Sequence, residues 1–129
     1  MFELTINNTV YEFNFGMGFM RELDPTITKP IDGVKGKVQN LGVQYAVAGI
    51  IDGDVETLGD VLIRGNKGFT PRLSQKDVDA FIENPETNLD EVFESVLGFL
   101  KSANVTKKTV TSLLETIEKQ KAEEAAKKA

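Results

Sequence analysis

Apolar and polar side chains alternate over residues 2–6 and again over residues 9–15. Two asparagines, Asn7 and Asn8, separate the two runs. A period of two residues is typical of a half-buried strand, and asparagine tolerates the positive φ angles that tight hairpin turns require. The pattern therefore predicts a β-hairpin over residues 2–15.

The next segments change from an extended to a helical pattern. Residues 17–23 predict a short helix that ends before Pro25. Residues 24–33 contain two prolines and a glycine, which predicts a connector. From Val34 onward the apolar period becomes three to four, which predicts a helix over residues 34–51 with apolar side chains on two faces.

Four shorter helical patterns follow, each with its own boundary signals. They cover residues 55–62, 75–83, 89–100 and 105–118. Asp54, Ser74 and Asn88 precede three of them, and all are residue types that accept hydrogen bonds from helix N-termini. In the clearest of these helices, at residues 89–100, we expect Phe93 and Leu97 to lie in the core.

Together these elements predict an α+β fold that is mainly α, with an N-terminal β-hairpin packed on about five helices. Residues 1–118 are expected to form a single globular domain, in which residues 34–118 are helical. No large apolar residue follows Ile117. A helix with no face to bury is marginal in water, so we expect residues 119–129 to be a charged, flexible tail.

Composition excludes several classes of chemistry. The chain has 129 residues, a net charge of −5, no cysteine and no histidine. It therefore lacks thiolate nucleophiles, imidazole bases and the commonest zinc ligands, and spacing singles out no acid–base pair. A surplus of acid also disfavours a nucleic-acid binder. We expect a protein that is not an enzyme and uses no cofactor and no metal.

The chain shows no membrane or secretion signal. No apolar run approaches the roughly 18 residues that a membrane span requires, and no basic stretch precedes an apolar one at the N-terminus. We therefore expect a soluble cytoplasmic protein with no membrane partner.

Two short motifs invite a chemical interpretation. The segment Asp52-Gly-Asp54-Val-Glu56 resembles the start of a calcium loop, but Thr57 and Ile63 stand where that loop needs glycine and glutamate. A capped turn between helices is the alternative. The basic, glycine-rich segment 64–72 lacks the spacing of a phosphate loop, and the alternatives are an exposed loop or a partner contact.

The overall layout resembles a known protein family. The features that carry the resemblance are the hairpin at residues 2–15, the segment 16–23, the paired apolar stripes of 34–51, and the Asn84-Pro-Glu break before a helix rich in Leu and Phe. In these the chain is similar to the tail assembly chaperones of siphophages and prophages of Gram-positive bacteria.

The resemblance implies a non-enzymatic role in building the tail. Proteins of this family bind the tape-measure protein, keep it soluble, help deliver major tail (tube) protein, and are absent from the finished virion. They act in the host cytoplasm, commonly self-associate, and several are made in two lengths. The alternatives are a structural tail or connector protein of the virion, and a small regulatory or nucleic-acid-associated adaptor.

The helix at residues 105–118 is the candidate partner-binding element. It is terminal, the break at residues 102–106 could act as a hinge, and its apolar stripe is narrow, as expected for pairing with another helix. The alternative is that this stripe simply closes the core. Its candidate residues are Val110, Leu113, Leu114 and Ile117.

Overall fold

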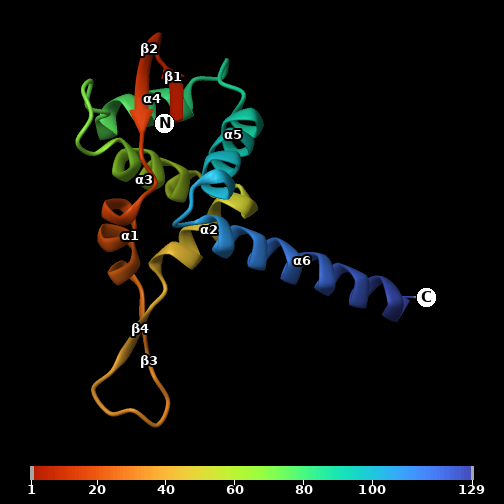
Figure 1. The fold of residues 1–129 in the computed structure, drawn as a ribbon. Helices are drawn as coiled ribbons and strands as arrows, with labels where there is room; N and C mark the ends of the chain where they lie inside the picture. The colour runs from red at the N-terminus through yellow and green to blue at the C-terminus, as the bar shows by residue number, and fades with distance from the viewer. Residues whose placement is uncertain (1, 129) are drawn as a thin grey trace.

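The computed structural model describes residues 2–128 and has a mainly helical α+β architecture. A small helical body carries an N-terminal hairpin on one side, and two elements project from that body (Figure 1). In chain order the elements are β1 (Phe2–Ile6), β2 (Thr9–Phe13), α1 (Met17–Leu23), η1 (Asp24–Thr26), β3 (Thr28–Pro30), β4 (Val38–Asn40), α2 (Gly42–Asp52), α3 (Val55–Asn66), α4 (Gln75–Glu83), α5 (Leu89–Ser102) and α6 (Lys107–Lys128).

The predicted N-terminal hairpin is confirmed. Strands β1 and β2 pair antiparallel, with Phe2 opposite Phe13. The turn residues Asn7 and Asn8 have φ angles of 51° and 67°, the left-handed conformation that this kind of turn requires. Pairing ends at Phe13, two residues earlier than the sequence predicts, and the chain then carries Phe15 into the core.

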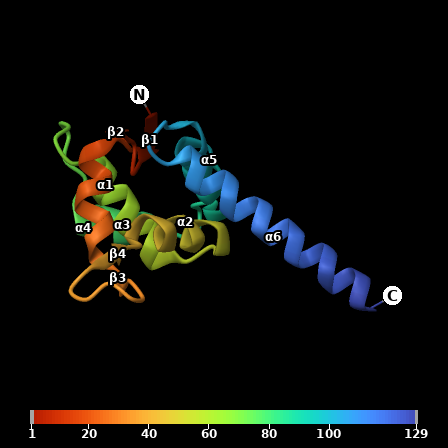
Figure 2. The ribbon, with the colours of Figure 1, turned by 60° about the horizontal axis from the view of Figure 1, so that its bottom comes forward.

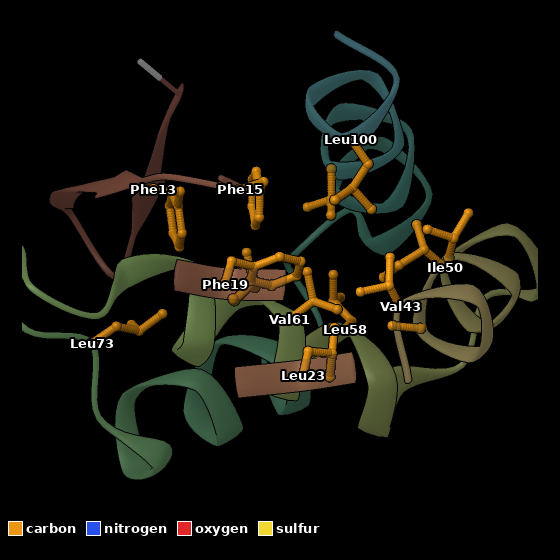
Figure 3. Packing of buried hydrophobic residues seen from close by; sticks show 14 of the residues in the cluster. Phe13, Phe15, Phe19, Leu23, Val43, Ile50, Leu58, Val61, Leu73 and Leu100 are labelled. Atoms are coloured by element: carbon orange, nitrogen blue, oxygen red, sulfur yellow. The ribbon is translucent and has the colours of Figure 1, made fainter. Parts of the chain in front are cut away.

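The core lies where the hairpin meets α1, α2, α3 and α5 (Figure 3). Phe13, Phe15 and Phe19 lie along one side of it, and the rings of Phe15 and Phe19 meet edge to face with centroids 5.0 Å apart. On the other side it is closed by aliphatic side chains of the helices, including Leu58 and Leu100. The hairpin therefore supplies aromatic residues to a core whose other walls are helical.

Two glycines allow close approach of main chains and rings. A Cβ atom at Gly42 would overlap the carbonyl oxygen of Leu23, so the start of α2 contacts the end of α1 directly. A Cβ atom at Gly65 would overlap the ring of Phe15. Both positions therefore require a residue without a side chain.

The helix predicted over residues 34–51 is wrong for its first eight residues. Residues 34–37 form a turn, β4 follows, and α2 begins only at Gly42. Gly33 and Gly36 have φ angles of 78° and 79°, which no right-handed helix contains. β4 pairs instead with β3, so residues 28–30 of the predicted connector are also strand. Val34 and Val38, which the predicted helix would bury, are consequently exposed.

The three helices of the second half begin where the sequence predicts. The side chains of Asp54, Ser74 and Asn88 each accept a hydrogen bond from the first turn of α3, α4 and α5. In α5, however, Val96 and Leu100 are the fully buried residues, whereas Phe93 and Leu97 are half-buried. The buried face is thus rotated from the predicted central line.

Helix α6 is a single helix of 22 residues whose far end stands away from the body (Figures 1 and 2). Its first turns pack against α5 and α2. Residues 119–127 are exposed, although they continue the helix. Whether this segment frays stays a prediction, and Ala129 lies outside the described residues.

Candidate partner-binding surfaces

The candidate stripe on α6 runs from the core to the surface. Val110 is fully buried, with 0% of its surface exposed. Leu113 and Leu114 are half-buried and pack against the core from its edge. Ile117, one turn farther on, is half-buried too, but it lies outside the set of residues that contact the core cluster. Val110 therefore closes the core, whereas the outer three residues, here called the rim of α6, are only half-buried.

The break before α6 is held by a buried hydroxyl group. Thr106 is fully buried, and its Oγ1 atom donates to the carbonyl oxygen of Leu100 over 2.5 Å. The amide of Lys107 donates to the carbonyl oxygen of Ala103 over 2.8 Å. These bonds fix the direction in which α6 leaves the body. Movement at residues 102–106 would have to break the buried bond of Thr106.

Asn66 is the centre of a buried hydrogen-bond network that the sequence does not reveal. Its amide nitrogen donates to the carbonyl oxygens of Glu12 and Pro71, at 3.0 and 3.2 Å. Its carbonyl oxygen accepts from the Arg72 guanidinium and from the Leu73 amide, at 3.0 and 2.6 Å. The side chain is fully buried, so it joins β2 to the loop after α3. In the sequence, an asparagine between glycine and lysine resembles any turn residue, so residue spacing does not reveal that its side chain is buried and bridges two segments.

The basic loop at residues 64–72 contacts the protein itself. Arg64 pairs with Glu22 and Asp60 at 3.1 and 2.8 Å, and Lys67 pairs with Glu22 at 2.8 Å. The hydrogen bond from Lys67 lowers the pKa of Glu22, and the charges of both cations act in the same direction. Arg72 also donates to protein oxygens. These cations stabilise the loop, and the geometry does not form a phosphate cradle.

The acidic segment between α2 and α3 is a capped turn, as the alternative to a calcium loop predicts. Gly53 has a φ angle of 77° and ends α2. Asp54 accepts from the Glu56 amide and from the Thr57 hydroxyl, at 3.2 and 2.8 Å. Within residues 2–128, no group of three or more acidic, cysteine or histidine side chains is placed to hold a metal ion.

Among the helices of residues 2–128, none has the length and apolar character that a membrane span requires.

Half of the large apolar residues that are exposed gather at the β3–β4 hairpin. Four of them, Ile27, Ile31, Val34 and Val38, lie in or beside the β3–β4 hairpin, and Tyr45 of α2 is 58% exposed. The second gathering is the half-buried rim of α6 described above. These two apolar surfaces are the candidates for partner binding.

Comparison with known proteins places the fold in a family. The sequence profile described as "Phage tail assembly chaperone protein, TAC" matches residues 3–115, which cover the hairpin, the body and the docked part of α6. Neither a curated protein nor a solved structure gives a significant match. Since the profile covers most of the chain, the protein belongs to the phage tail assembly chaperone family.

Proposed function

We propose that this protein binds the tape-measure protein of a phage tail, keeps that chain soluble, and promotes assembly of the tail tube around it. Family membership supports a chaperone role in tail assembly. The proposed action is non-covalent binding, and the major tail protein is the second proposed partner. The protein acts in the host cytoplasm and leaves before the virion is complete.

The burial gradient along α6 supports a contact there. Val110 anchors the helix in the core, while Leu113, Leu114 and Ile117 leave part of their apolar surface in water. Ile117 lies four residues after Leu113 and three after Leu114, so the three residues share one side of the helix. An amphipathic client helix binds such a stripe through residues at similar spacing.

The charge of the molecule supports a solubilising role. A client helix with an uncovered apolar stripe would aggregate through that stripe. This chain carries a net charge of −5, and the exposed end of α6 is rich in both Glu and Lys. Covering the client stripe while adding charged surface would keep the complex in solution.

Co-expression with the tape-measure protein tests the proposal. The wild-type chain is expected to move the client into the soluble fraction and to co-purify with it. Ile117→Glu should remove this effect while the protein stays folded, because Ile117 lies outside the core cluster. The control is Val10→Glu, which makes the same kind of change at an exposed site on β2 and should retain the effect.

Point variants separate client binding from folding better than a truncation does. Removing everything after Asn104 would also remove Thr106 and Val110 from the core and so destabilise the body. If Ile117→Glu solubilises the client as well as the wild type does, the contact does not lie on this stripe. If the wild type itself leaves the client insoluble, the proposed function is wrong.

Purified virions provide a separate test of the role. A chaperone should be missing from them, whereas a structural tail or connector protein should be present in fixed copy number. Quantitative mass spectrometry of purified particles distinguishes the two. Stoichiometric amounts of this chain in virions would contradict the chaperone role.

A further inference from the structure

The β3–β4 hairpin, here called the arm (residues 28–40), projects from the body beside α1 and α2 (Figure 1). Every residue of the arm is exposed, and Val34 and Val38 are 47% and 56% exposed. Only its base is fastened, where the amide of Leu41 donates to the carbonyl oxygen of Ile27 over 2.7 Å. A two-stranded hairpin without a packed face is marginally stable in water, so this arm needs a surface to cover it.

The arm differs from the rest of the chain in charge. It carries Lys29, Lys35 and Lys37 against a single acid, Asp32, in a chain with a net charge of −5. Its apolar residues Val34 and Val38 thus flank the basic residues Lys35 and Lys37. The complementary surface is one in which exposed apolar side chains are bordered by carboxylates.

The body presents such a surface, here called the trough. It consists of two adjoining hollows of about 650 and 480 Å³ across α2, α3 and α4, which share Asp54, Thr57 and Asp60. Exposed Tyr45 and Val55 supply apolar area. Its lining includes no lysine and no arginine but six carboxylates, from Asp52, Asp54, Glu56, Asp60, Asp79 and Glu83.

Most of these carboxylates face solvent. Among the ion pairs of residues 2–128, only one involves the trough, the pair between Asp60 and Arg64. Asp54 caps α3, but Glu56 and Glu83 are exposed and take part in none of those pairs. The trough thus has negative charge to offer a basic partner.

We propose that the arm of one copy docks in the trough of a second copy, with arm lysines against trough carboxylates and Val34 or Val38 against Tyr45 and Val55. The contact joins two different surfaces, so it forms either a closed assembly or an open chain of copies. This contact involves neither α6 nor a client, and it stands apart from the proposed function.

Charge reversal tests the contact by sedimentation equilibrium. The wild type is expected to self-associate at about 100 µM, and the association should weaken with added salt. The arm variant Lys35→Glu/Lys37→Glu and the trough variant Glu56→Lys/Glu83→Lys should each weaken it at least about tenfold. All four side chains are exposed, so both variants should fold, which circular dichroism would verify.

Two further samples make the test specific. Combining the four changes in one chain should restore association, because the charges are then opposite again. The control Lys119→Glu/Lys121→Glu changes the net charge as the arm variant does, but on exposed α6, and should associate like the wild type. A monomeric wild type, an arm variant that behaves like this control, or a four-fold variant without restored association would each overturn the proposal.

Discussion

A few individual residues determine how the segments of this molecule meet. Asn66 is the clearest case, because one buried side chain bonds to the backbone of β2 and to the loop after α3. Replacing it would leave buried polar groups without partners, which costs more than the bonds themselves contribute. The residue acts on stability and has no direct contact with either candidate surface.

Asn66→Ala should therefore lower the free energy of unfolding by about 2–3 kcal/mol. The loss arises because the Leu73 amide and the Glu12 carbonyl group lose their partner. Chemical denaturation measures it, with exposed Asn104→Ala as the control, expected within about 0.5 kcal/mol of the wild type. Equal midpoints for the two variants would show that the hydrogen-bond network does not stabilise the fold.

Two helical glycines should respond oppositely to alanine. At Gly42 the new methyl group would meet the backbone of Leu23 and Asp24, which cannot move aside, so the variant should lose about 3 kcal/mol. At Gly98 nothing lies within 4 Å of the new group, so Gly98→Ala should gain about 0.5–1 kcal/mol from helix propensity. Thermal melts of both variants measure the difference. A stable Gly42→Ala would contradict the close approach of α1 and α2.

At the level of elements, the sequence predicts correctly the helices and strands whose local signals, such as alternation or a capping side chain, agree with their place in the fold. The first hairpin has both its alternation and its Asn-Asn turn, and α3, α4 and α5 each have a capping side chain. For residues 34–41 the sequence predicts a helix wrongly, because Val34, Val38 and Leu41 have helical spacing. The positive φ angles of Gly33 and Gly36 exclude a helix there. The sequence shows that these two residues are glycines but does not show their backbone angles.

The candidate site was predicted only in part, for a similar reason. Periodicity identified the apolar stripe of α6, but it could not divide the stripe between core and surface. That division depends on where α5 and α2 contact α6. Thr106 sets the direction in which α6 leaves the body, through a buried hydrogen bond to α5. The sequence does not reveal the arm, because Val34 and Val38 have the spacing of a buried helix and residues 28–33 have the composition of a connector.

The rotated core face of α5 gives a test at this scale. Leu100→Ala should cost about 3–4 kcal/mol, because Leu100 is almost fully buried and would leave a cavity. Phe93→Ala should cost less, although it removes more atoms, because Phe93 is only half-buried. Urea titration of the two variants decides the order. A larger loss for Phe93→Ala would restore the face that the sequence predicts.

The outer half of α6 gives a second test of a single element. Residues 119–127 are helical but exposed, and their Glu-to-Lys pairs contribute only about 0.2–0.5 kcal/mol each. We expect their amides to exchange with solvent far faster than those of residues 107–118, which pack on the body. Hydrogen exchange of the free protein measures both segments. Equal protection along the whole helix would show that something else holds the outer half.

The whole molecule is a small helical body with two projections of different character. The arm is basic and apolar, whereas α6 begins as a core helix and ends as a charged one. They leave the body in different directions, so a copy-to-copy contact and a client contact would not compete for the same surface (Figures 1 and 2).

Hydrogen exchange of the purified complex with the tape-measure protein tests the central claim most directly. The account predicts that binding slows exchange in the stretch around Leu113, Leu114 and Ile117 at least about tenfold relative to the free protein, while β1 and β2 stay unchanged. A stable complex in which this part of α6 exchanges as in the free protein would contradict it, as would the failure of any complex to form.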